Sequence, residues 1–247
     1  MATASPDLIS RVIPFSISSS VPAIGTRFRR FSTLIIRTIL LRNVRAALLL
    51  GLLGLCLAGP VQARGQSVLV LGDSISAAYG MSLEQGWVAL LAQQLEREDP
   101  PWQVVNASIS GETTGGGLRR LPGLLEQHQP ALVILELGGN DGLRGFPLDA
   151  LRDNLQQLVS LSQRAGAEVI LVPMEIPPNY GARYTAGFRD SFVEIARATD
   201  SVLAPFLLAG VATDPTLMQA DGIHPAVAAQ PILLENILPT VREALAD

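Results

Sequence analysis

Ser74 stands in a setting that suits nucleophilic catalysis. It comes shortly after an apolar run at 68–71, and Gly72, directly after that run, allows the backbone to turn sharply. If the run is a buried strand, Ser74 lies at its carboxyl end, which is where ligands bind in open α/β sheets. The serine is therefore a candidate nucleophile. The alternative is that Asp73 and Ser74, which are both good N-caps, begin a helix.

A histidine that could activate this serine occurs late in the chain. Asp221 precedes His224 by three residues in an expected loop, so its carboxylate can fold back onto one ring nitrogen while the other faces outward. A histidine held in this way can take a proton from a serine hydroxyl. The alternative is that Asp221 or His224 caps the helix that we expect to begin near Pro225.

Two further residues could stabilise the negative charge that develops on oxygen during acyl transfer. Gly111 offers an unobstructed backbone N–H, and Asn140 offers a side-chain amide. Each also fits an ordinary turn, as part of Gly-Glu and of Gly-Gly-Asn-Asp. The joint arrangement favours catalysis, because Ser74, Gly111 and Asn140 each follow a predicted strand at its carboxyl end.

Alternating elements would bring these residues to one edge of a sheet. We expect strands at 68–71, 102–106, 131–137, 168–172 and 201–206, and helices at 84–98, 114–128, 148–165, 182–199 and 226–245. Five such alternations are typical of the α/β class, here a three-layer α/β/α sandwich with a five-stranded parallel sheet. In such a sheet all carboxyl ends meet at one edge.

The segment 42–63 has the three parts of a secretory signal peptide. Arginines precede an apolar run at 46–59, and small residues lead to Ala63, after which we expect cleavage. An uncleaved membrane anchor is the alternative, although the run is shorter than the ~20 residues needed to span a bilayer. Residues 1–41 are interpreted as a disordered or mis-called extension, and 64–247 as a single domain that is periplasmic or secreted.

The composition excludes several other chemistries. The chain contains no lysine, and its one cysteine, Cys56, lies within the predicted signal peptide. Residues 64–247 therefore offer no disulfide, no cysteine nucleophile and no Schiff-base lysine. Their 11 arginines and 21 acidic residues give a formal net charge of −10, which disfavours nucleic acids and anionic membranes as partners. With only two histidines and no Cys/His cluster, a zinc site is not expected.

Four blocks of the sequence resemble the SGNH, or GDSL-like, hydrolase family, and most closely its bacterial secreted branch of thioesterase I, lysophospholipase and arylesterase enzymes. The blocks are GDSISAAYG, ASISGETT, ELGGNDGLRG and DGIHP. The resemblance covers about 67–240 and implies the flavodoxin-like SGNH-hydrolase fold. Ile75 stands where the family motif has leucine, a conservative change outside the chemistry.

The resemblance also implies a role for each candidate residue. Ser74 would be the nucleophile, His224 the base and Asp221 its partner. The oxyanion hole would consist of the backbone N–H groups of Ser74 and Gly111 and the side chain of Asn140.

These observations predict a serine hydrolase that cleaves acyl esters and thioesters through an acyl-enzyme, without metal or cofactor. Apolar loop residues are expected to line the acyl groove: Leu143, Phe146, Ile176, Pro177, Pro178 and Tyr180. We expect a monomer that binds a small acyl substrate, no nucleic acid, and no membrane stably once the signal is removed. The alternatives are a carbohydrate O-deacetylase with the same chemistry, and a non-enzymatic binding module on the same fold.

Overall fold

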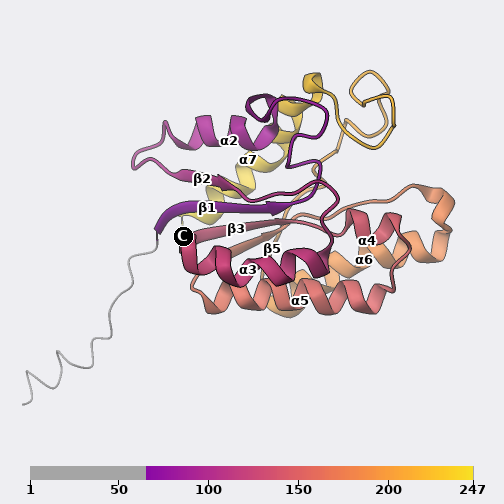
Figure 1. Cartoon of the computed structure of the whole chain (residues 1–247), viewed down its shortest axis with the longest axis horizontal. Helices are drawn as coiled ribbons and strands as arrows, with labels where there is room; N and C mark the ends of the chain where they lie inside the picture. Colours follow the sequence, from indigo (N-terminus) through magenta and orange to yellow (C-terminus); the bar gives the residue numbers. More distant parts are fainter. Residues whose placement is uncertain (1–64, 247) are drawn as a thin grey trace, which may run out of the picture. The chain divides into compact units, whose positions relative to one another are not determined.

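Five parallel strands form one sheet in the computed structural model, which describes residues 65–246. The strands are β1 (Gly65–Gly72), β2 (Gln103–Asn106), β3 (Pro130–Glu136), β4 (Glu168–Leu171) and β5 (Val202–Leu203). They lie in the order β2-β1-β3-β4-β5 (Figure 1). The predicted signal peptide at 42–63 and the predicted extension at 1–41 lie outside the described residues.

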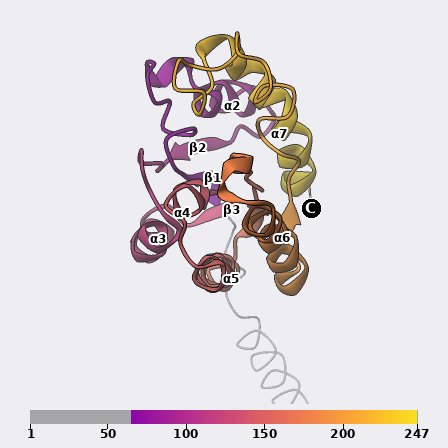
Figure 2. The same ribbon diagram turned by 90° about the vertical axis from the view of Figure 1, so that its right-hand side faces the viewer.

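Helices cover both faces of this sheet. On one face lie α2 (Trp87–Leu95) and α7 (Gln230–Ala246), and on the other α3 (Thr114–His128), α5 (Leu148–Arg164) and α6 (Ala182–Thr199) (Figures 1 and 2). The short helix α4 (Gly139–Leu143) and three 3-10 turns, Leu83–Gln85, Pro178–Tyr180 and Val227–Ala229, complete the elements. Within 65–246, no helix is long and apolar enough to span a lipid bilayer. The predicted three-layer α/β/α sandwich is confirmed.

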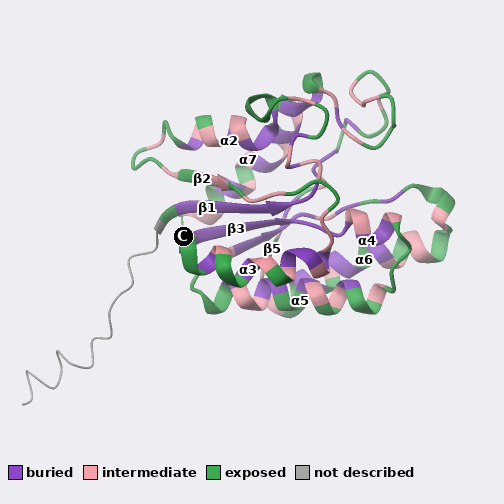
Figure 3. Cartoon of the chain, viewed as in Figure 1, coloured by how far each residue is buried: buried purple, intermediate pink, exposed green. Residues whose placement is uncertain are grey.

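Alternate side chains of β1 supply both halves of the core. Val68 and Val70 pack in the cluster that includes α2 and α7, whereas Leu69 and Leu71 pack in the cluster that includes α3, α5 and α6. All four side chains are fully buried, and Figure 3 shows β1 and β3 buried along nearly their whole length. Because both faces of the sheet are covered, these strands are apolar without alternation.

Some predicted elements are shorter or interrupted in the structure. The helix expected at 84–98 is instead a 3-10 turn followed by α2, because Gly86 is extended and the Gln230 side chain accepts the Trp87 N–H at 2.9 Å. The closing helix expected from residue 226 is likewise a 3-10 turn followed by α7. The last strand, expected at 201–206, is only the two-residue β5.

The register of the three neighbouring strands sets the geometry of the functional edge. Gly72, the last residue of β1, pairs with Glu136, the last residue of β3. The loop that follows β2 continues alongside β1, where the N–H of Ile109 donates to the Gly72 carbonyl at 3.1 Å. Segments that leave β1, β2 and β3 therefore begin side by side.

Candidate active site

Ser74 lies in a turn directly after β1 and does not begin a helix. Residues 74–80 form consecutive turns, in which the N–H of Ala77 bonds the Asp73 carbonyl and the N–H of Tyr79 bonds the Ser74 carbonyl. The Asp73 side chain accepts the N–H of Ile75 at 3.1 Å, so it stabilises the turn itself. The helix-cap alternative for Asp73 and Ser74 therefore does not apply.

The structure brings Ser74, His224 and Asp221 into one chain of hydrogen bonds. The His224 Nε2 atom lies 2.8 Å from the Ser74 hydroxyl oxygen, and its Nδ1 atom lies 2.7 Å from Asp221 Oδ2. The other Asp221 oxygen accepts the backbone N–H groups of Ile223 and His224 at 2.9 and 3.0 Å. Neither Asp221 nor His224 caps the closing helix, because the 3-10 turn before α7 has Ala226 as its N-cap.

Asp221 stays ionised because its oxygens accept these hydrogen bonds. The backbone N–H of His224, then the His224 ring, then the N–H of Ile223 lower the pKa of Asp221 to about 2. An ionised carboxylate can only accept, so His224 Nδ1 carries the proton of their shared hydrogen bond. Nε2 is then free to accept the Ser74 hydroxyl proton, which is the arrangement that a general base requires.

Asn140 lies beside this group, in the first turn of α4. Its side-chain nitrogen donates to Asp73 Oδ2 at 3.1 Å. An amide nitrogen carries two hydrogens, so the contact with Asp73 orients the side chain and leaves one N–H available. Asn140 lines the same cavity as Ser74 and His224.

Gly111 lies on the adjoining loop, in a turn closed by a 3.1 Å hydrogen bond from the Glu112 N–H to the Ile109 carbonyl. Its φ of 78° lies in the left-handed region, which glycine adopts without strain. The Arg144 side chain donates to the Gly111 carbonyl at 3.1 Å and so links this loop to the end of α4. Gly111 does not line the cavity beside Ser74.

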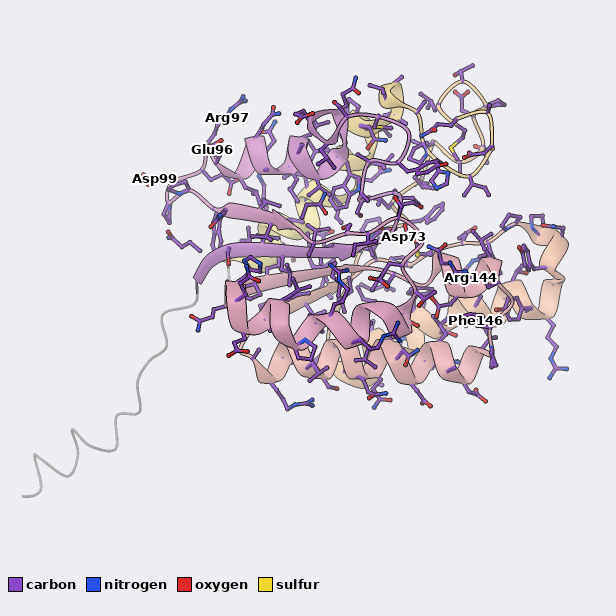
Figure 4. The ribbon with its side chains drawn as sticks, in the orientation of Figure 1. Asp73, Glu96, Arg97, Asp99, Arg144 and Phe146 are labelled. Carbon is purple, nitrogen blue, oxygen red and sulfur yellow. The ribbon has the colours of Figure 1, made fainter. Side chains whose placement is uncertain are left out.

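A cavity of about 430 Å³ opens beside Ser74 and His224, and most of its remaining lining is apolar, with Asp73, Asn140 and Glu175 as the other polar side chains. Its apolar side chains come from several loops and are Ile75, Leu143, Met174, Ile176, Pro177, Pro178, Leu208, Ala212, Met218 and Ile223. Two residues that we expected in the acyl groove do not line it. Tyr180 borders a separate hollow of about 850 Å³ at the ends of α5 and α6, which contains no triad residue. Phe146 is 41% exposed, beyond Arg144 in Figure 4.

Several residues of the site region have a burial or a contact that the sequence did not indicate. Asp73, labelled at the end of β1 in Figure 4, is 3% exposed, and burial raises its pKa to about 6. Glu136 is fully buried and lies next to it. The Tyr79 ring lies 4.4 Å from the His224 ring, and the Met174 sulfur accepts the Gly139 N–H at 3.0 Å. A lone acidic residue inside the apolar run 131–137 is the one pattern that could have indicated Glu136.

The sequence and the fold are similar to those of known proteins. The sequence matches the profile of the GDSL-like Lipase/Acylhydrolase family over residues 70–230. It is 51% identical over 202 residues to Esterase TesA of Pseudomonas aeruginosa, covering 82% of this chain and 100% of that protein. It is 44% identical over 173 residues to Thioesterase 1/protease 1/lysophospholipase L1 of Escherichia coli K12, covering 70% of this chain and 82% of that protein.

A solved structure has a similar fold over nearly the same region. It is that of the psychrotrophic esterase EstA from Pseudoalteromonas sp., inhibited by monoethylphosphonate. It aligns with a TM-score of 0.71 and 45% identity, over 74% of this chain and 100% of that one.

The low pKa of Asp221 predicts how the stability of an Asp221→Asn variant depends on pH. In the folded protein this pKa is about 2, below the ordinary 3.8. The ionised carboxylate therefore stabilises the protein above about pH 4, and this contribution is lost as the pH falls towards 2. The side chain is 39% exposed, so solvent screens the effect, and we expect the variant to melt up to about 4 °C below the native protein at pH 6.

This difference in melting temperature should narrow below about pH 4 in thermal melts followed by circular dichroism. Asp149→Asn, on the surface of α5, serves as the control for removing an exposed acidic group. A difference that stays constant or grows towards pH 3 would contradict the assignment.

Proposed function

The chain belongs to the GDSL-like lipase/acylhydrolase family and is an ester and thioester hydrolase, and we propose that Ser74 is its nucleophile, His224 its general base and Asp221 the residue that orients the base. The observation that carries this assignment is the continuous chain of hydrogen bonds from Asp221 through His224 to the Ser74 hydroxyl. It supplies a nucleophile, a base and an orienting group at hydrogen-bonding distances.

The reaction proceeds in two steps that use the same base. Ser74 Oγ attacks the substrate carbonyl carbon as His224 Nε2 takes the hydroxyl proton, and Asp221 stabilises the imidazolium that results. The tetrahedral intermediate then collapses, and His224 gives the proton to the departing alcohol or thiol. Water, activated by His224, attacks the acyl-enzyme in turn, releases the acid and returns the proton to Ser74.

The negative oxygen of each tetrahedral intermediate needs donors that are already in place. We assign this role to the backbone N–H groups of Ser74 and Gly111 and to the free N–H of the Asn140 side chain. The Asp73 contact supports the assignment of Asn140, since it fixes the amide before substrate arrives. The turn at Gly111 and its link to Arg144 hold the second loop near the end of α4.

The cavity favours an acyl chain over a sugar as the group that enters it. We propose that Leu143, Ile176 and Pro177 form one wall of the acyl groove, and that Met174, Leu208 and Met218 complete it. Such a lining gains free energy by burying methylene groups, about 0.8 kcal/mol for each one. A carbohydrate O-deacetylase would instead present polar partners to hydroxyl groups around the ester.

Replacement of Ser74 tests its role as the nucleophile. We expect Ser74→Ala to fold normally and to lose hydrolysis of p-nitrophenyl esters by at least about 10³-fold, because no other group forms the acyl-enzyme. Initial rates and circular dichroism spectra measure the two properties. Ser160→Ala, on the surface of α5, is the control and should retain native activity. Near-native turnover of Ser74→Ala would exclude the mechanism.

The acyl group of the substrate can be tested with a series of esters. Across p-nitrophenyl esters from acetyl to dodecanoyl, kcat/KM should rise with chain length before levelling off, by up to about fourfold for each buried methylene. Thioesters with the same acyl groups should show the same order. A maximum at acetyl with a steady decline for longer chains would favour the O-deacetylase.

We further propose that the protein is exported and acts in the periplasm or outside the cell. The support is the signal-peptide pattern at 42–63, and Edman sequencing of protein recovered from the periplasm should begin at Arg64. A mature protein that retains residues 42–63 would contradict export by this signal.

We propose a monomer, because one chain supplies the whole triad, and size-exclusion chromatography with light scattering tests this.

A further inference from the structure

Glu136 is a fully buried carboxyl group directly behind the Ser74 turn. It is the last residue of β3, it pairs with Gly72 of β1, and none of its surface is exposed. Its side chain packs directly against Gly72. A Cβ added to Gly72 would lie 2.6 Å from Glu136 Oε2. Gly72 is thus required for this close approach.

One oxygen of Glu136 holds the turn on both sides of the nucleophile. Oε2 accepts the backbone N–H of Asp73 at 3.2 Å and the hydroxyl of Ser76 at 2.6 Å. The Ser76 carbonyl also accepts the side chain of Asn106, from β2, at 2.8 Å. The turn that carries Ser74 is therefore fixed to the strands on either side of β1.

The same contact extends to the oxyanion site. Asp73, whose N–H Glu136 holds, accepts the Asn140 side chain through its own carboxylate at 3.1 Å. A displacement of the Asp73 backbone would move both Ser74, which follows it directly, and the amide of Asn140. Misplacement of reacting groups by about 1 Å can lower a rate about 10²-fold.

We propose that Glu136 is a positioning residue for the hydrolysis reaction, which fixes Ser74 and Asn140 by accepting hydrogen bonds from Ser76 and Asp73. The inference rests on the proposed roles of Ser74 and Asn140. The hydrogen-bond partners of Glu136 are Ser76 and Asp73. Among the described residues, no hydrogen bond joins it to the proposed nucleophile or base, so it acts through these two partners.

Glu136 performs this role as a neutral acid. Burial, and then the nearby carboxylate of Asp73, raise the pKa of Glu136 well above its usual value. Its second oxygen, Oε1, is buried and has no hydrogen-bond partner among the described residues. A proton on Oε1 leaves Oε2 as a carbonyl-type acceptor for both donors, whereas an ionised group would be a buried charge without a cation.

Three variants separate positioning from simple structural support. Glu136→Gln keeps a carbonyl acceptor without charge, Glu136→Ala removes the acceptor, and Ser76→Ala removes its shorter hydrogen bond. Ser162→Ala is the matched control, because Ser162 is also a buried serine whose hydroxyl bonds one oxygen, the Leu158 carbonyl at 3.0 Å, but it lies within α5. The rate constant kcat is expressed per chain that a fluorophosphonate labels to completion, so unfolded protein does not count.

We expect Glu136→Gln to keep kcat within about fivefold of native, and Glu136→Ala to lower it about 30-fold or more. Ser76→Ala should lower kcat about tenfold, with KM within about threefold in every variant, because the groove itself is unchanged. Ser162→Ala should match the native enzyme. This pattern would support Glu136 as a neutral hydrogen-bond acceptor that positions Ser74 and Asn140 for the transition state.

Three results would overturn the proposal. Native kcat per labelled chain in both Glu136→Ala and Ser76→Ala, with lower melting temperatures, would make the role purely structural. A Gln variant as impaired as the Ala variant would mean that charge, and not the acceptor, matters. If Glu136→Ala does not fold, the two serine variants decide. Equal kcat in Ser76→Ala and Ser162→Ala would then overturn the proposal. Failure of the native protein to be labelled at Ser74 would instead refute the proposed function, before any variant is compared.

Discussion

The parallel pairing of β1 with β2 and β3 is the constraint on which the site depends. β1 and β3 are buried on both faces and have a paired neighbour on either side, so their register cannot slip without moving apolar side chains out of the core. Ser74 and Asn140 come within four residues of the ends of β1 and β3 and inherit that rigidity. The long loop before α7 brings His224 to them, and Gln219 ties it to the Ser74 turn by a 2.8 Å hydrogen bond to the Tyr79 carbonyl.

Three carboxyl groups near the nucleophile differ because their surroundings differ. Asp221 is partly exposed and accepts hydrogen bonds from His224 and Ile223, so its pKa falls and it stays charged beside the imidazole. Asp73 and Glu136 are buried next to each other, so burial raises the pKa of both. In the proposed mechanism the charged group orients the base, and we infer that the two buried groups fix the backbone and the Asn140 amide. Residue type alone would not separate these roles.

The sequence predicted the sheet and its helices, and it placed Ser74, Asp221 and His224 on loops at one edge of that sheet, because these features depend on local patterns. Apolar runs end at Gly72 and Leu137, and each is followed within a few residues by a polar side chain that can take part in catalysis. The ends of the strands, and the polar residues that follow them, could therefore be located. The interruption at Gly86 depends on a side chain 144 positions away, that of Gln230, which no local pattern contains. The same reason explains why Glu136 was missed, since its role depends on the register between β1 and β3.

The acyl groove was the least predictable part of the site. Leu143, Ile176 and Pro177 border the cavity, but Phe146 and Tyr180 from the same two loops do not. The Tyr180 hydroxyl bonds the Leu143 carbonyl at 2.7 Å, which directs that ring into the loop packing. Leu208, Ala212 and Met218, from the loop before Asp221, had no pattern that distinguished them from other apolar residues. Apolar loop residues can face a cavity or the core, and only the fold decides between them.

Peptide mapping of the protein after reaction with a fluorophosphonate tests the central claim most directly, because the reagent bonds covalently to the oxygen of an activated serine. We predict one adduct per chain, on the peptide that contains Ser74, and loss of that adduct when His224 is replaced by alanine. An unlabelled native protein, or an adduct on another serine with Ser74 unmodified, would contradict it.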